Sequence, residues 1–396
     1  MRKIIVSAPG KILLLGAYAI LERPNVGYVI SVNKRVFVFV KERKDKKIIF
    51  HLPQFKILRE GCFKEDRIFF KEKLNNQEKE FLKFLKSAVE TFLILLSFKK
   101  KNFSGFEIKT FSDPAFGLGK EKSGLGASAA VVCATIAALF NFFGLKRDKE
   151  KILKLSHFAH FQAQGKIGSG FDISSALLGS QEYVRFSPSF FEKIKNKFDL
   201  LKLLEKKWDF KIKKIDFPKN FFILFGNFKN LSTSSAEMVR KVIVFKEKKP
   251  MLYQKIISDL NRANLKTIKS LEKLKFYYSK DEKKYQKELF IFKKNFKEAE
   301  KIKKKLGQKS GVEIEPKELS CLIKKSEKEG AFLATLPGAG GWDGICALCL
   351  GKENLEKVKN FWKRSFGKKI KIFEIFVDNQ GIKREKSFPL KNLGYN

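Results

Sequence analysis

The pattern of apolar and polar positions divides the chain into alternating strands and helices. Apolar residues alternate with polar ones over some stretches, as in half-buried strands, and recur with helical spacing over others. In the first half this pattern predicts strands at 2–8, 35–43, 106–113 and 182–188, and helices at 78–98, 129–143 and 147–166. We expect Asp148 to cap the last of these helices, and residues 9–11, Pro-Gly-Lys, to turn the first strand.

The second half shows the same mixture of elements. It predicts strands at 220–226, 345–351 and 369–377. A helix rich in lysine and glutamate is expected over 281–306, packed on one face. Residues 43–75 are charged and irregular, which indicates hairpins or a surface insertion, and 190–216 suit an inter-domain connection. Because 396 residues are too many for one ordinary core, we predict two α+β domains, residues 1–205 and 206–396.

The formal net charge is +41, from 83 lysine and arginine residues against 42 aspartate and glutamate residues. Such a charge is typical of proteins that bind nucleic acid or membrane surfaces. Here the basic residues are spread along the whole chain, which indicates a compositional bias and still favours anionic small molecules as ligands. No apolar stretch reaches the ~20 residues that span a bilayer. We predict a soluble, cytoplasmic protein without a nucleic-acid or membrane partner.

The cysteines and histidines predict neither a disulfide framework nor a metal site. There are five cysteines, an odd number. Cys346 and Cys349 are three positions apart on a predicted strand, so they should point to opposite faces and pack in the core. His157 and His160 share a helical face without a third ligand nearby, and we interpret them as hydrogen-bonded or solvated.

The stretch KEKSGLGASAAVVCATIAALF, residues 120–140, places glycines on a turn before an apolar helix. Backbone N–H groups at a helix N-terminus attract phosphate, and Gly124 and Gly126 would let a phosphate approach them closely. Ser128 adds a hydroxyl that can ligate Mg²⁺, and Lys122 adds positive charge. The spacing is neither that of a Walker A loop nor that of a dinucleotide-binding loop. Taken alone, the turn is equally well explained as a tight, well-packed loop.

Two other stretches carry a charged residue close to glycines. SAPGKILLLGAYAIL, residues 7–21, places Lys11 directly after the first predicted strand. AQGKIGSGFDISSALLGS, residues 163–180, sets Asp172 among glycines and other small residues. A helix N-cap is the alternative role for this aspartate.

In this order and spacing, the three stretches resemble the GHMP kinase superfamily, which includes galactokinase, homoserine kinase, mevalonate kinase and phosphomevalonate kinase. A fourth stretch, LPGAGGWDGICAL, residues 336–348, resembles the late glycine-rich motif of the superfamily. Within it, the chain is similar above all to the phosphomevalonate kinase branch of the eukaryotic type. The motifs that carry this resemblance are GAY, where mevalonate kinases have Gly-Glu-His, then HFQAQGKIGSGFD (160–172), STSSAEMVRKV (232–242) and PGAGGWD (337–343).

The resemblance implies a two-domain α+β GHMP kinase fold. The N-terminal, ATP-binding domain would contain a left-handed βαβ crossover, the C-terminal domain would be ferredoxin-like, and the active site would lie between them. The implied activity, in the mevalonate pathway of isoprenoid biosynthesis, uses ATP and Mg²⁺. It transfers the γ-phosphoryl group of ATP to 5-phosphomevalonate, giving 5-diphosphomevalonate and ADP.

The resemblance also implies roles for single residues. Lys11 matches the phosphate-contacting lysine, and Asp172 matches an aspartate near the acceptor that could orient Lys11, take a proton or bind a substrate hydroxyl. These two are the predicted catalytic residues. The predicted nucleotide-binding residues are Lys122, Gly124, Leu125, Gly126, Ala127, Ser128 and Ala129, with Ser128 also a metal ligand. The predicted acceptor-binding residues are Tyr18, Lys166, Ser169, Ser232, Thr233, Gly338, Ala339 and Gly340. Lys122 and Lys166 could instead be solvated surface lysines, and 232–235 an ordinary helix cap.

The chain departs from the superfamily pattern at two places. The common Gly-Leu-Gly-Ser-Ser-Ala motif has Ala127 in place of its first serine, whereas Ser128 remains. Mevalonate kinases supply a Mg²⁺-binding glutamate from the helix before the aspartate, where this chain has His160, Gln162 and Gln164 and no carboxylate. The metal would then be held through water or by Asp172.

Two other functions stay open at this point. One is mevalonate kinase, or another GHMP small-molecule kinase, whose hydroxyl acceptor would depend more on a base. The missing Gly-Glu-His argues against it. The other is a non-catalytic protein on the same scaffold whose basic surface binds nucleic acid. Intact Lys11, Ser128 and Asp172 argue against this second alternative.

Overall fold

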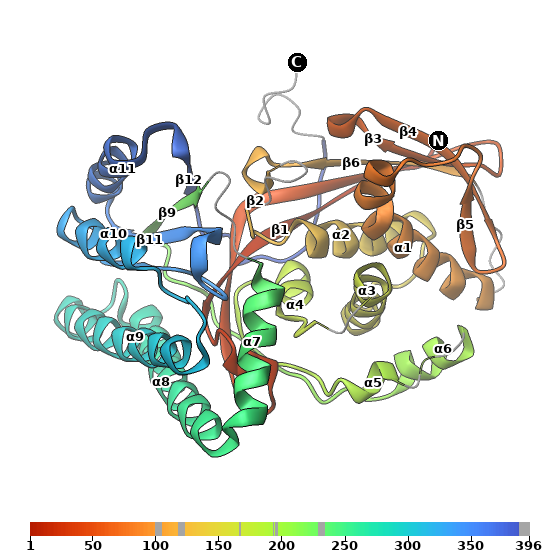
Figure 1. Cartoon of the computed structure of the whole chain (residues 1–396). Helices are drawn as coiled ribbons and strands as arrows, with labels where there is room; N and C mark the ends of the chain where they lie inside the picture. The colour runs from red at the N-terminus through yellow and green to blue at the C-terminus, as the bar shows by residue number, and fades with distance from the viewer. Residues whose placement is uncertain are drawn as a thin grey trace.

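The computed structural model of the chain describes residues 1–99, 105–117, 123–165, 168–192, 194, 197–228 and 234–387. These residues form two β-sheets with helices packed against them (Figure 1). In the larger sheet the main path runs β13-β1-β2-β6-β3-β4-β5, and β7 and β8 extend it from β2. Its strands are β1 (Lys3–Leu15), β2 (Gly27–Glu42), β3 (Ile48–Leu52), β4 (Ile57–Lys64), β5 (Arg67–Phe70), β6 (Phe106–Ser112), β7 (Gln181–Val184), β8 (Lys211–Lys214) and β13 (Lys383–Arg384).

Strand β1 does not end at residues 9–11, so the predicted turn there was wrong. The strand continues to Leu15, and its register against β2 shifts between Pro9 and Gly10. A local irregularity of this kind accommodates a proline, which has no N–H to donate to the sheet. Lys11 therefore stands on the strand itself, opposite Ser31 of β2.

The charged segment 43–75 extends the larger sheet. Strands β3, β4 and β5 pair antiparallel in sequence order, which confirms the predicted hairpins. Strand β3 also pairs parallel with β6, and the chain between them passes through helix α1 (Asn76–Phe98). The left hand that we predicted for the crossover remains a prediction.

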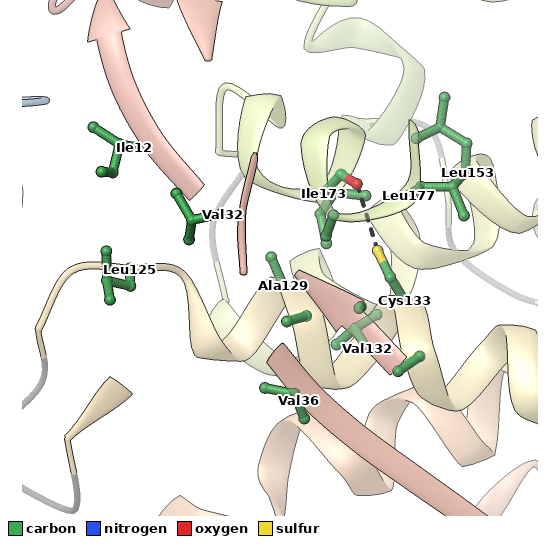
Figure 2. Packing of buried hydrophobic residues seen from close by; sticks show 14 of the residues in the cluster. Ile12, Val32, Val36, Leu125, Ala129, Val132, Cys133, Leu153, Ile173 and Leu177 are labelled. Carbon is green, nitrogen blue, oxygen red and sulfur yellow. Dashed lines mark hydrogen bonds between the residues drawn. The ribbon is translucent and has the colours of Figure 1, made fainter. Parts of the chain in front are cut away.

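Helices α1, α2 and α4 cover one face of the larger sheet, and α3 packs against these helices (Figure 1). With α1, these are α2 (Ala127–Phe142), α3 (Lys149–Gln164) and α4 (Phe171–Leu178), and the short helices α5 (Ser189–Glu192) and α6 (Lys197–Glu205) follow β7. Asp148 caps α3 as predicted, accepting the N–H of Lys151 at 3.0 Å. Helix α2 is apolar all round and rich in alanine, as expected of a helix enclosed by others. Figure 2 shows Cys133 of α2 against Ile173 of α4, whose carbonyl accepts its S–H at 3.5 Å.

The smaller sheet has the strand order β10-β11-β9-β12, and all neighbours are antiparallel. Its strands are β9 (Phe221–Phe228), β10 (Leu333–Thr335), β11 (Ile345–Leu350) and β12 (Ile370–Ile375). Its helices are α7 (Ser235–Lys248), α8 (Pro250–Tyr277), α9 (Glu282–Ser310), α10 (Lys317–Lys328) and α11 (Lys352–Phe366). In the described part of the chain, helices α7 to α10 lie between β9 and β10, and α11 lies between β11 and β12. This strand order is that of the predicted ferredoxin-like domain. Short 3₁₀ turns occur at Ala19–Leu21, Pro53–Phe55, Pro114–Phe116, Gly341–Asp343 and Gly367–Lys369.

After β12 the chain returns to the larger sheet. Strand β13 pairs with β1 at Val6, and Asp378 forms an ion pair with Arg35 of β2 at 2.8 Å. Strand β8, which follows the predicted boundary at 205/206, pairs with β7 in the larger sheet. The two domain ranges remain a prediction, while the larger sheet contains strands from both ends of the chain.

The two cysteines of β11 are buried on opposite faces of the strand, as predicted. Cys346 packs in the cluster that continues into the larger domain, and Cys349 packs in a separate cluster with Trp362 of α11. Burial raises the pKa of both thiols, that of Cys349 to about 12. They are therefore core residues without nucleophilic character at neutral pH.

Across the described ranges, none of the helices combines the length and the apolar character that a bilayer crossing requires.

Candidate active site

Lys11 lies against the glycine turn that precedes α2. Its backbone N–H donates to the carbonyl of Leu125 at 2.9 Å, and its Nζ donates to the carbonyl of Gly124 at 2.7 Å. Gly126, with φ of +86°, is the N-cap of α2. A Cβ on Gly126 would lie 3.1 Å from the Cγ of Lys11, so the glycine makes room for the lysine side chain. Lys11 and the turn, far apart in sequence, thus form one site.

The ammonium group of Lys11 faces carboxylates from both domains. Burial lowers its pKa, and the carboxylates of Asp172 and Asp343 oppose that effect. The ring of Phe171 lies 5.4 Å from the Nζ, within cation–π range. The two carboxylates and the ring favour the charged form of Lys11, which is the form that binds phosphate.

Asp172 is the second residue of α4. The N-cap of this helix is Gly170, so the alternative interpretation of Asp172 as a cap was wrong. Its Oδ1 accepts the N–H of Ile173 at 2.9 Å. Gly170 has a φ of +83°, and a Cβ there would lie 2.5 Å from the Cε1 of His157. Only glycine fits this approach between α4 and α3, which sets the position of Asp172.

The glycine-rich loop of the C-terminal domain, residues 336–344, reaches the same place. The hydroxyl of Tyr18 donates to the carbonyl of Ala339 at 2.8 Å, and the N–H of Gly338 donates to the carbonyl of Leu13 at 3.0 Å. Burial raises the pKa of Tyr18, and Asp343 raises it further, so this phenol remains a neutral donor. These two hydrogen bonds hold the loop against β1 and the turn that follows it.

Two adjoining cavities lie where these segments meet. The first has a volume of 230 Å³ and the second 460 Å³. Lys11, Tyr18, Gly124, Ser169, Gly338 and Asp343 are among the residues that line the first. His157, His160, Gln164, Asp172 and Arg240 are among those that line the second. The cavities share Leu21, Ser169, Ser235 and Val239, so they adjoin along these residues.

Ser128, in the first turn of α2, presents an oxygen donor of the kind that Mg²⁺ prefers. Its Oγ lies 3.2 Å from the Nε2 of His160. The described residues contain no group of three or more His, Cys, Asp or Glu side chains suited to a metal ion. A single hydroxyl fits Mg²⁺ when the remaining ligands are nucleotide phosphates and water, which is common for this ion.

The structure brings most of the predicted site residues together. Lys11, Tyr18, Gly124, Leu125, Ser169, Gly338 and Ala339 line the first cavity and Asp172 the second, while Gly126, Ala127, Ser128 and Ala129 form the start of α2. The side chains of Leu125 and Ala129 are buried in the core (Figure 2), which leaves their backbone for a ligand. Gly340 lines neither cavity. It packs against Ile314 instead, because a Cβ at this position would lie 2.3 Å from the carbonyl oxygen of Ile314. Lys122, Lys166, Ser232 and Thr233 lie outside the described residues.

Sequence reasoning missed three residues of the site. Asp343 and Ser235 both line the first cavity, and Ser235 Oγ donates to Asp343 Oδ2 at 2.8 Å. Asp343 is the last residue of the motif PGAGGWD, and Ser235 lies in the motif STSSAEMVRKV. These motifs could have identified both residues from the sequence. Phe171, beside Lys11, precedes Asp172 directly. The neighbouring Ser234 caps α7, as the alternative interpretation of 232–235 held.

Comparison with known proteins agrees with this geometry. Residues 83–180 match the N-terminal domain of the GHMP kinases, and residues 288–369 match their C-terminal domain. A phosphomevalonate kinase of Saccharolobus solfataricus is 32% identical over 394 residues, which cover 96% of this chain and 99% of that protein. A phosphomevalonate kinase of Candida albicans is 29% identical over 407 residues, which cover 91% of each chain.

A solved structure shares the fold over nearly the whole chain. It is that of Streptococcus pneumoniae phosphomevalonate kinase in complex with phosphomevalonate and AMPPNP. The TM-score is 0.69 at 18% identity, and the match covers 97% of this chain and 100% of that one. Together with the 32% identity over almost the full length of a curated relative, the two-domain fold and the assembled motifs establish that this chain belongs to the phosphomevalonate kinase family of the GHMP kinases, which are ATP-dependent phosphotransferases.

Proposed function

We propose that the protein transfers the γ-phosphoryl group of ATP to the phosphate of 5-phosphomevalonate, giving 5-diphosphomevalonate and ADP in the mevalonate pathway of isoprenoid biosynthesis. The observation that carries this proposal is the position of Lys11. It contacts the glycine turn of α2 and lines a cavity that residues of both domains enclose. A cation at that point can touch the donor and the acceptor phosphates together.

The acceptor is a nucleophile without further activation. The second pKa of a phosphate monoester is about 6, so at neutral pH most of the acceptor is a dianion. One of its oxygens forms the new bond to the γ-phosphorus, and the bond from that phosphorus to the bridging oxygen breaks. ADP leaves with the electron pair. Asp172 then serves to orient Lys11, to bind a substrate hydroxyl or to take the proton of the minor monoanion.

The larger barrier is the repulsion between two polyanions. Two like unit charges about 4 Å apart repel by about 4 kcal/mol at an effective dielectric constant of about 20. Lys11 and the backbone N–H groups at the start of α2 offset this repulsion. Mg²⁺, held by Ser128 and the phosphates, would supply further positive charge. We also assign Lys122 to the nucleotide and Lys166, Ser232 and Thr233 to the acceptor, as the resemblance implies.

The acceptor end of the cavity is assigned to Tyr18, Ser169 and the 338–339 backbone. Tyr18 stands where mevalonate kinases carry a histidine, which favours a phosphorylated acceptor over mevalonate itself. Its hydroxyl is already bonded to Ala339, so it shapes the pocket and does not act as a base.

The experiment is to measure ADP release by the purified protein with Mg·ATP and, separately, 5-phosphomevalonate, mevalonate and 5-diphosphomevalonate. Turnover with 5-phosphomevalonate alone, lost in Lys11→Met, supports the proposal. Turnover with mevalonate instead would keep the kinase and overturn the acceptor. No ADP release with any of the three, combined with salt-sensitive DNA binding, would favour the non-catalytic alternative.

A further inference from the structure

His160 of α3 contacts the hydroxyl predicted to ligate the metal. His160 Nε2 and Ser128 Oγ are 3.2 Å apart, although 32 residues separate them in sequence. The imidazole is 7% exposed, and its ring stacks on Phe84 of α1 with centroids 5.0 Å apart and an interplanar angle of 27°. Side chains from α1 and α2 therefore fix this ring of α3 in place.

The imidazole faces the hydroxyl of Ser128 through its Nε2, and which of the two groups donates the hydrogen bond depends on the tautomer of the ring. A neutral imidazole has one N–H and one nitrogen that accepts hydrogen bonds. A serine hydroxyl has one hydrogen to donate and two lone pairs. If the accepting nitrogen is Nε2, the hydroxyl hydrogen points to the ring and both lone pairs stay available.

We propose that His160 is a positioning residue for the metal-nucleotide complex: its Nε2 accepts the hydrogen of the Ser128 hydroxyl and so directs the serine oxygen toward the cation that accompanies ATP. The inference rests on the proposed function and deepens it. Outer partners of this kind orient metal ligands in many sites. In this chain the imidazole of His160 orients the hydroxyl of Ser128. The segment of α3 around His160 contains no carboxylate that could bind the metal instead.

His157, one turn earlier on the same helix, does not share this role. It is also buried, but its Nε2 has no hydrogen-bond partner, and its ring lies among Phe186 and Trp208. Two histidines on one face of α3 therefore differ in function: His157 packs beneath Gly170, and His160 reaches the start of α2.

The test compares nucleotide binding with and without metal. The probes are Mn²⁺·ADP, and ADP in the presence of EDTA, each titrated calorimetrically into the full-length protein. Removing an outer partner of a metal ligand typically costs about 10- to 100-fold in affinity. We expect His160→Phe to weaken Mn²⁺·ADP by about that factor and to leave metal-free ADP within about twofold. His160→Gln, whose side-chain oxygen can accept the same hydrogen, should restore most of the affinity.

A double-mutant cycle separates this role from a general loss of packing. If His160 acts through Ser128, the variant with both Ser128→Ala and His160→Phe should bind Mn²⁺·ADP no more weakly than Ser128→Ala alone. His51→Gln, on β3, is the control for loss of an imidazole elsewhere, and melting curves of all variants verify folding.

Several results would overturn the inference. These are equal losses for Mn²⁺·ADP and metal-free ADP, additive losses in the cycle, or a pulsed-EPR signal of ¹⁴N bound directly to Mn²⁺, which would make His160 a ligand itself. Wild-type protein that binds no nucleotide at all would contradict the proposed kinase function. Tight binding that none of the variants changes would contradict the role of His160 alone.

Discussion

Tyr18 and Ala339 join the two domains at the site. The phenol of Tyr18 follows β1 of the larger sheet, Ala339 lies in the glycine-rich loop of the smaller one, and a 2.8 Å hydrogen bond connects them. The bond is partly buried, at the wall of the cavity that Lys11 also lines. The geometry of the proposed acceptor pocket therefore depends on contact between the domains.

Tyr18→Phe removes this bond without removing the ring. We expect a loss of about 1 kcal/mol of stability, because the carbonyl of Ala339 loses its partner. The KM for the acceptor should rise several-fold while the KM for ATP changes little, since the glycine turn is untouched. Steady-state kinetics with each substrate varied in turn measure this. An increase confined to the KM for ATP would indicate that Tyr18 acts at the nucleotide end of the site, and its assignment to the acceptor would be wrong.

Lys11→Met tests the charge at the centre of the site. Loss of one group that stabilises a transition-state charge commonly costs about 100- to 1,000-fold in kcat, and we expect a loss of that size or more. The melting temperature should not fall, because the substitution removes a cation that burial disfavours. Lys34→Met, on β2, is the control for loss of a lysine. If Lys11→Met kept wild-type kcat, the proposed role of Lys11 would be wrong.

Gly126→Ala tests the fit between the lysine side chain and the glycine turn. The residue has a positive φ, and a Cβ would press on the Cγ and Cε of Lys11 at 3.1 and 3.2 Å. We expect a stability loss of about 1–2 kcal/mol from the left-handed backbone and, in addition, a large fall in kcat as Lys11 is displaced.

Gly144→Ala is the matched control for that variant. Gly144 follows the other end of α2 with φ of +63°, but a Cβ there meets no atom within 4 Å. Its stability loss should therefore be similar and its activity unchanged. Equal activity losses in both variants would show that backbone strain, and not the position of Lys11, is responsible.

Acid sensitivity should follow from His157. Burial lowers its pKa to about 3 in the folded protein, against 6.5 for an ordinary histidine; the carboxylate of Asp172 opposes this shift in part, and His160 adds slightly to it. Between these two values the unfolded chain binds a proton at this residue and the folded chain does not, so stability falls as the pH falls through this range.

From pH 7.5 to 5.5, His157 should cost about 1.4 kcal/mol of unfolding free energy. Urea unfolding at both pH values measures this, and His157→Phe should lose that much less over the same interval. A variant with the same pH dependence as wild type would indicate that the histidine is protonated in the folded state or that other groups dominate.

Much of the site could be predicted from sequence because glycines and charges carry local signals. The glycine turn, the aspartate after Gly170 and the capping of α3 by Asp148 each depend on neighbours within a few residues. The strand through Pro9 and Gly10 could not be predicted, because pairing with β2 overrides the local turn preference. Contacts such as Lys11 with Gly124, or His160 with Ser128, join segments whose distance in space is fixed only by the packing of β1, α2 and α3.

The return of the chain after β12 to the larger sheet has a consequence for protein synthesis. Strand β13 pairs with β1, the strand that carries Lys11, and Arg35 of β2 pairs with Asp378. During translation, the edge of β1 that pairs with β13 therefore stays open until β13 has left the ribosome. The smaller domain, which is contiguous between β9 and β12, can be complete earlier, so β1 reaches its final pairing after the smaller domain has formed.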